Sequence, residues 1–158
     1  MEEKIITSTI RVCQLNEIDG KEQELIQLAI QATERSYAPY SKFNVGAAVL
    51  LANGTTIQGC NQENAAFGVC MCAERTAIFS AGAQYPGVPI VAIAIAARNS
   101  DGLLEEPVTP CGSCRQAMIE TEIRGHRKLR ILLYGTRHIF SINGIETLMP
   151  LSFSDKQL

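Results

Sequence analysis

The chain has 158 residues, of which 46% are hydrophobic and 19% charged, and its formal net charge is -2. This length and composition predict one domain, residues 1–158, with a substantial hydrophobic core. A nucleic-acid partner or an anionic membrane surface would require a basic face, and the net charge gives no support for one. The longest apolar run, VPIVAIAIAA, is too short for a membrane span, which needs roughly 20 residues. We therefore expect neither a nucleic-acid partner nor a membrane partner.

The N-terminal sequence MEEKIITSTI opens with acidic residues and contains no apolar signal-peptide segment, so we expect a cytoplasmic protein. Its six cysteines are then expected to be reduced. In such a protein, closely spaced cysteines indicate metal binding or catalysis more often than disulfides. Residues 1–18 have only weak patterning, and we expect them to form a loose N-terminal arm.

The first predicted helix begins at Asp19, because Asp19 and Glu22 have the spacing of a capping box. Apolar residues then follow at helical spacing. The helix should end near Ser36, since Pro39 disfavours helical backbone in the residue before it.

A β-hairpin is predicted next, with strands over residues 43–52 and 55–61. Asn53 and Gly54 separate two apolar stretches, and this dipeptide is typical of a two-residue turn in which both positions have positive φ.

The rest of the chain alternates helices and strands. We expect a helix from about Cys72 to Ala81 that ends at Gly82, where glycine is a common helix stop. The further predicted elements are a strand over 90–97, a helix over 111–125, strands over 129–134 and 138–142, and a short helix over 145–149. The last two strands should be antiparallel, because the GTR connection between them is too short for a parallel crossover. The order predicts an α/β fold, a mixed five-stranded sheet with helices on its faces.

Cys111 and Cys114, in the sequence PCGSC, lie three residues apart at a predicted helix start and can bind one metal ion. Candidates for a third ligand elsewhere in the chain are Cys13, Cys60, Cys70, Cys72, His126 and His138. The two histidines are too far apart for a two-histidine zinc finger. Cys72 is favoured because Glu74, two residues later, places a carboxylate beside the water position of a three-ligand zinc site.

Four segments, YAPYSKFNVGAAVL, GCNQENAAFG, CAERTAIF and PCGSCRQAM, resemble the short cytidine deaminases in both order and spacing. The resemblance extends over about Tyr37–Phe153. It implies a three-layer cytidine-deaminase-like fold and one Zn²⁺ per subunit. It also implies hydrolysis of cytidine and deoxycytidine to uridine, deoxyuridine and ammonia in pyrimidine salvage, by a homotetramer.

The resemblance also assigns roles to individual residues. It implies that Cys72, Cys111 and Cys114 bind zinc, that Glu74 transfers protons, and that Arg75 hydrogen-bonds the zinc thiolates. The residues implied to contact the nucleoside are Phe43, Asn61, Glu63 and Ala73. Phe67 and Phe153 are implied to approach a nucleoside in a neighbouring subunit.

Three features depart from the family pattern: Asn44 and Phe67 replace common proline and tyrosine residues, and the tail LSFSDKQL lacks a Gly-Pro pair. Three other functions would require different features. A structural zinc module would need a fourth protein ligand and no Glu74. A deaminase of bases in RNA or DNA would favour a basic surface and a helix between the last two strands. The third is a deaminase of a cytidine-like antibiotic such as blasticidin S, but NQEN, residues 61–64, favours an ordinary ribose over such a substrate.

Overall fold

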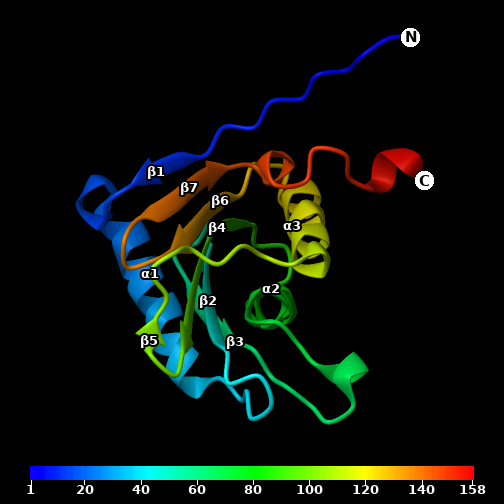
Figure 1. Cartoon of the computed structure of the whole chain (residues 1–158). Coiled ribbons are helices and arrows are strands. Elements are labelled where there is room, and N and C mark those ends of the chain that lie inside the picture. The colour runs from blue at the N-terminus through cyan, green and yellow to red at the C-terminus, as the bar shows by residue number, and fades with distance from the viewer.

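The computed structural model describes all residues, 1–158, and its centre is one mixed β-sheet (Figure 1). The strand order is β1-β7-β6-β4-β2-β3, with β5 paired to β4. The strands are β1 (Arg11–Cys13), β2 (Asn44–Leu51), β3 (Thr56–Cys60), β4 (Ile90–Asn99), β5 (Gly102–Leu103), β6 (Arg130–Tyr134) and β7 (Ile139–Asn143). The pairing of β4 with β6 is parallel and every other pairing is antiparallel. The predicted antiparallel pairing of the last two strands, β6 and β7, is confirmed.

Helices cover both faces of the sheet. The helix α1 (Gly20–Ala32) packs on one face, and α2 (Ala73–Gln84) and α3 (Gly112–Gly125) pack on the other (Figure 1). Alternate residues of the strands fill two cores: Ala48, Ala94 and Leu132 face α1, whereas Ala47, Ile95 and Leu133 face α2 and α3. The predicted three-layer α/β class is confirmed. The two additional strands, β1 and β5, are too short to show an alternating pattern.

Capping explains where α1 begins. The side chain of Asp19 accepts a hydrogen bond from the backbone N–H of Glu22 at 3.1 Å, so the predicted cap is present. The reciprocal half of the predicted capping box is not formed, because the Glu22 carboxylate accepts from Arg130 instead. The helix α2 was predicted to stop at Gly82, and this was wrong: it continues to Gln84, because Ala83 and Gln84 favour helix and the next breaker is Pro86. The predicted last helix is a single 3₁₀ turn, Ile145–Thr147.

The hairpin between β2 and β3 is present, but its turn differs from the prediction. Gly54 has a φ of +87°, whereas Asn53 is not among the positive-φ residues. The backbone N–H of Leu51 donates to the carbonyl of Thr55 at 2.8 Å, which closes a three-residue loop. Such a loop needs one left-handed residue, which glycine supplies at little cost.

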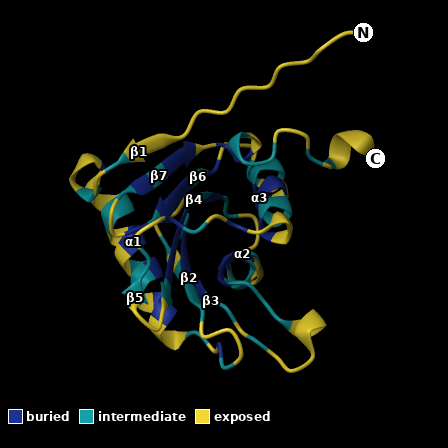
Figure 2. Ribbon diagram, in the orientation of Figure 1, coloured by how far each residue is buried: buried dark blue, intermediate teal, exposed yellow.

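The N-terminal segment divides into two parts. Residues 1–10 are exposed and extended, and they form no hydrogen bonds within the chain (Figure 2). Residues 11–13 form β1 on the outer edge of β7, and Ile18 is buried. The loose arm is therefore shorter than predicted. No helix of the structure combines the length and apolar character of a membrane span.

Close contact between β3 and α2 depends on Gly59. A Cβ atom at Gly59 would lie 2.5 Å from the backbone nitrogen of Ala77 and 2.6 Å from the carbonyl oxygen of Ala73. We expect Gly59→Ala to push α2 away from the sheet and to lower the free energy of unfolding by about 1–3 kcal/mol. Urea unfolding measures this loss.

The matched control is Gly82→Ala in α2, the helix that packs against Gly59. Its Cβ atom would lie no closer than 3.6 Å to any neighbouring atom, a side-chain nitrogen of Arg124. Alanine favours helix over glycine by about 1 kcal/mol, so this variant should be at least as stable as the natural protein. Equal destabilisation by the two substitutions would contradict the close-contact explanation.

Candidate metal and substrate site

The starts of α2 and α3 bring together the three thiols that the sequence singles out. Cys72 and Cys111 are the N-cap residues of α2 and α3, and Cys114 lies in the first turn of α3. The sulfur atoms are 3.8 Å apart for Cys72 and Cys111 and 3.5 Å apart for Cys111 and Cys114. All three sulfurs lie within 4.8 Å of one another. Helix N-termini favour negative charge, so this position suits thiolates.

The donor set fits zinc. Tetrahedral Zn²⁺ with Zn–S bonds of about 2.3 Å requires sulfur atoms about 3.8 Å apart, close to the spacing found between Cys72 and Cys111. The cluster has three protein donors and no fourth. Three donors leave one tetrahedral position for water or substrate, which is typical of catalytic zinc sites rather than structural ones.

Hydrogen bonds within the cluster favour the ionised form of one thiol. The pKa of Cys72 is lowered to about 5, chiefly because of hydrogen bonding with Cys114 and with Arg75. The pKa of Cys114 is raised, because its hydrogen bond to Cys72 and its burial both favour the protonated form. Without a cation, the cluster therefore keeps part of its protons. A divalent ion would stabilise three thiolates together.

Arg75 supplies positive charge next to the thiols. Its Nη2 atom donates to the Cys72 sulfur at 3.6 Å. Its Nε atom is buried and has no hydrogen-bond partner, and such a donor is costly unless a nearby negative charge stabilises the guanidinium. A zinc ion bound by three thiolates would carry a net negative charge, which Arg75 would offset.

Glu74 places a buried carboxyl group in the first turn of α2, two residues after Cys72. It is 5% exposed. Burial raises the pKa of the Glu74 carboxyl above its usual value, and the charge of Cys72 raises it further. A carboxyl with a raised pKa is suited to taking up and releasing a proton near neutral pH.

A cavity of about 310 Å³ adjoins the thiols and the carboxyl of Glu74. This volume is at the lower end of the range of small-molecule sites. All four residues predicted to contact the nucleoside line it, together with two zinc-site cysteines. The thirteen lining residues are Phe43, Val45, Asn61, Gln62, Glu63, Cys70, Met71, Cys72, Ala73, Glu74, Val108, Thr109 and Cys111. The structure thus gathers these predicted residues in one place, while their individual roles stay predictions.

Asn61 and Glu63 shape the cavity wall by hydrogen-bonding the segment before β2. The Asn61 side chain accepts from the Val45 N–H at 2.7 Å and donates to the Phe43 carbonyl at 2.9 Å. The Glu63 carboxylate accepts from the Tyr40 N–H at 2.9 Å. Its pKa is lowered, chiefly by a hydrogen bond with the Ser41 side chain, so the group is ionised.

The other candidate ligands and contact residues lie apart from the thiol cluster. The Cys70 sulfur accepts from the Asn64 N–H at 3.2 Å instead. Phe67 and Phe153 line no part of this cavity and are 76% and 59% exposed. The Phe67 ring meets Tyr40 edge-on, with the ring centroids 6.2 Å apart. The predicted role of Phe67 and Phe153 requires a neighbouring subunit.

The chain matches a known protein family. Residues 19–126 match the model of the cytidine and deoxycytidylate deaminase zinc-binding region. The chain belongs to this family. The matched region contains the three cysteines and Glu74, as well as every residue that lines the cavity.

Individual relatives agree with this membership. The chain is 50% identical to a cytidine deaminase of Halalkalibacterium halodurans over 98 residues, which cover 62% of this chain and 70% of the relative. A cytidine deaminase of Mycobacterium tuberculosis is 39% identical over 92 residues, covering 58% and 65%. Among solved structures, a cytidine deaminase of Burkholderia pseudomallei is 42% identical with a TM-score of 0.70, covering 82% of this chain and 97% of that one. The suspected resemblance is confirmed.

Sequence reasoning missed two residues next to the deaminase motif PCGSC. Arg115 donates to the Pro110 carbonyl at 2.8 Å and to the Leu148 carbonyl at 2.7 Å, which ties the turn before Cys111 to the chain after β7. Gln116 donates to the Phe153 carbonyl at 2.9 Å. A cation in the first turn of a helix is electrostatically unfavourable, and this mismatch was the available signal that Arg115 has a specific partner.

Proposed function

We propose that this protein is a zinc-dependent deaminase of cytidine and deoxycytidine. The observation that carries the proposal is the position of Glu74, a buried carboxyl on the wall of the cavity that two of the three zinc-site cysteines line. Water adds to C4 of the cytosine ring, the bond between C4 and the exocyclic nitrogen breaks, and ammonia and the uracil nucleoside remain. Pyrimidine salvage in the cytoplasm is the role that such a reaction would serve.

Cys72, Cys111 and Cys114 would hold the zinc ion. When bound there, Zn²⁺ supplies Lewis acidity that makes water a better nucleophile at neutral pH. Glu74 takes the proton from water on its carboxylate and delivers it to N3 of the cytosine ring. The carboxylate then takes the second proton from the hydroxyl on C4 and passes it to the exocyclic nitrogen, so that ammonia leaves and the C4 carbonyl forms. A single group can serve both transfers because burial raises the pKa of the Glu74 carboxyl, which helps it to hold a proton between the two steps.

The cavity wall supplies the recognition groups. Phe43 offers an aromatic face for the pyrimidine, and the backbone of Ala73 borders the ring beside Glu74. The ionised Glu63 and the amide of Asn61 are suited to the hydroxyl groups of the sugar, since a carboxylate accepts strong hydrogen bonds from hydroxyl donors. The small volume of the cavity favours a single nucleoside over a nucleic-acid strand.

The test is ammonia release from cytidine, deoxycytidine, adenosine and blasticidin S, measured with and without a strong zinc chelator. We expect release from the first two substrates alone, loss of that release in chelator, and recovery on addition of Zn²⁺. Release from blasticidin S instead would favour the antibiotic deaminase. If the zinc-loaded protein released no ammonia from any of the four compounds, the proposal would be refuted.

A homotetramer is proposed for the assembly. Several large apolar side chains outside the N-terminal segment are exposed, and exposed apolar surface favours subunit contacts. They include Tyr37, Tyr40, Phe67, Val69, Phe79, Leu151 and Phe153. In the tetramer, Phe67 and Phe153 would approach a neighbour's nucleoside. Light scattering that gives the mass of one or two chains would contradict this assembly.

A further inference from the structure

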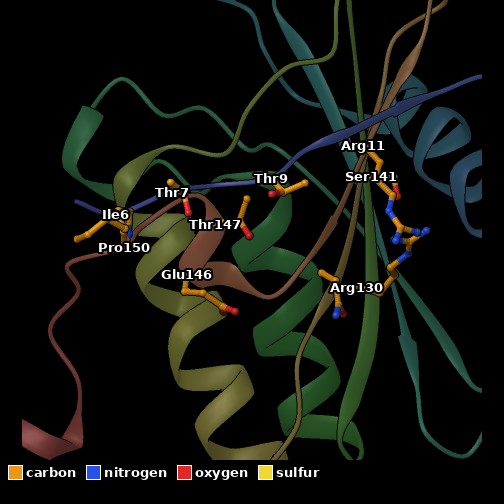
Figure 3. A pocket seen from close by; sticks show the side chains of 10 residues that line it. Ile6, Thr7, Thr9, Arg11, Arg130, Ser141, Glu146, Thr147 and Pro150 are labelled. Carbon is orange, nitrogen blue, oxygen red and sulfur yellow. The ribbon is translucent and has the colours of Figure 1, made fainter. Parts of the chain in front are cut away.

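A second cavity lies at the opposite edge of the sheet, where the N-terminal segment passes β7 and the 3₁₀ turn at Ile145–Thr147 (Figure 3). Its volume is about 620 Å³. The lining residues are Ile6, Thr7, Thr9, Arg11, Arg130, Ser141, Asn143, Glu146, Thr147 and Pro150. All ten lie outside residues 19–126, the region that matches the deaminase family. The deaminase site described above therefore does not account for this cavity, which we term the arm cavity.

The lining of the arm cavity is polar and rich in hydrogen-bond donors. Four hydroxyl groups, one amide and two guanidinium groups face it, and no aromatic ring does. Stacking of a nucleobase is therefore disfavoured. Small hydrophilic ligands match such a lining better than the mostly apolar molecules that ordinary ligand pockets bind.

The sheet register places the two arginines on one face. Arg11 pairs across the sheet with Ser141, and Arg130 pairs with Asn143. Cross-strand partners project to the same face, so Ser141 and Asn143 on β7 lie between the two guanidinium-bearing strands. From strand spacing and rise, the Cα atoms of Arg11 and Arg130 are roughly 12 Å apart, a distance that two long side chains can bridge around one anion.

Among the charged groups that line the arm cavity, the guanidinium of Arg11 has no ion-pair partner. Arg130 donates to the Glu22 carboxylate at 2.7 Å from Nε and 3.1 Å from Nη2, which leaves its Nη1 free to donate elsewhere. The one acidic lining residue, Glu146, forms an ion pair with Lys128. Arg11 takes part in none of the ion pairs of the chain.

The arrangement in Figure 3 separates the two ends of the arm cavity. Arg11, Ser141 and Arg130 gather at one end, and Ile6 and Pro150 lie at the other, with Thr147 and Glu146 between them. We propose that the arm cavity binds a small phosphate-bearing molecule, with its phosphate at the arginine end and a hydroxylated remainder along Thr7, Thr9 and Thr147. Guanidinium and hydroxyl donors together match the several oxygens of a phosphate group.

Calorimetric titration of the full-length, zinc-loaded protein tests this site. The probes are inorganic phosphate, ribose 5-phosphate and ribose, at low ionic strength. We expect ribose 5-phosphate to bind more tightly than inorganic phosphate, and ribose not to bind. Arg11→Gln should weaken phosphate binding by about tenfold or more, since hydrogen bonds to charged groups contribute about 1.5–3 kcal/mol. Arg11 is exposed and unpaired, so the variant should fold and deaminate cytidine normally.

The matched control is Lys4→Gln, which removes the same charge from the same segment outside the arm cavity. It should bind ribose 5-phosphate like the natural protein. Equal weakening by the two variants would overturn the site, because general electrostatic attraction would then explain the binding. Unchanged binding by Arg11→Gln, or no binding of either phosphate at millimolar concentration, would overturn it too. Because binding is read directly, these outcomes are independent of which nucleoside the enzyme deaminates.

Discussion

Glu74→Gln is expected to lower kcat for cytidine by about 10²–10⁴-fold, the usual contribution of a positioned general acid and base. Glutamine has nearly the shape of glutamate and fits the same buried position at the start of α2, but it cannot accept a proton from water or pass one to the ring. Zinc content should remain one ion per chain, since the substitution leaves all three thiols unchanged. The melting temperature should stay the same or rise, because burial disfavours the ionised carboxylate that is removed.

The measurements are steady-state kinetics with cytidine, zinc analysis and thermal unfolding of the same preparation. Glu120→Gln is the matched control: it makes the same chemical change on the exposed face of α3 and should keep natural kcat. Near-normal turnover by Glu74→Gln would show that another group carries the proton. Loss of zinc from this variant would instead mean that Glu74 supports the metal.

Cys114→Ser is expected to abolish tight zinc binding and, with it, deamination. A serine hydroxyl does not ionise near neutral pH and is a harder donor than a thiolate, so it binds zinc poorly. Changes outside the ligand shell typically cost 10–100-fold in metal affinity, and the loss of a ligand should exceed about that range. Because zinc stabilises only the folded state, the variant should also lose the fall in melting temperature that a chelator causes in the natural protein.

Cys70→Ser provides the comparison for this variant. Cys70 lines the same cavity, but its sulfur is hydrogen-bonded to the backbone of Asn64 and stands outside the three-thiol cluster. A hydroxyl can make the same hydrogen bonds, so this variant should keep its zinc and its response to chelator. Full zinc retention by Cys114→Ser, or zinc loss from Cys70→Ser, would mean that the ligand set is wrong.

Sequence by itself determined the features of this protein that depend on residues close together in the chain. Asp19 predicted the start of α1 because a cap and its N–H partner are three residues apart. Cys72 with Glu74, and Cys111 with Cys114, predicted the chemistry of the site because each pair belongs to one helix start, where spacing alone sets relative position. The order of strands and helices predicted a mixed sheet with helices on its faces, because the pattern of each element is carried by residues close together in the chain.

Tertiary structure decided what depends on residues far apart in the chain. Cys72 and Cys111 are 39 residues apart, and their sulfurs meet because α2 and α3 lie side by side on one face of the sheet. β1 forms because the edge of β7 offers it partners 126 or more residues away, and its three residues carry too little pattern to predict that pairing. The link from Arg115 to Leu148, and the meeting of Arg11 with β7 at the arm cavity, likewise come from packing of distant segments. Hydrogen bonds between such distant segments form only after the sheet has brought their partners together. The sequence near each partner therefore does not predict them.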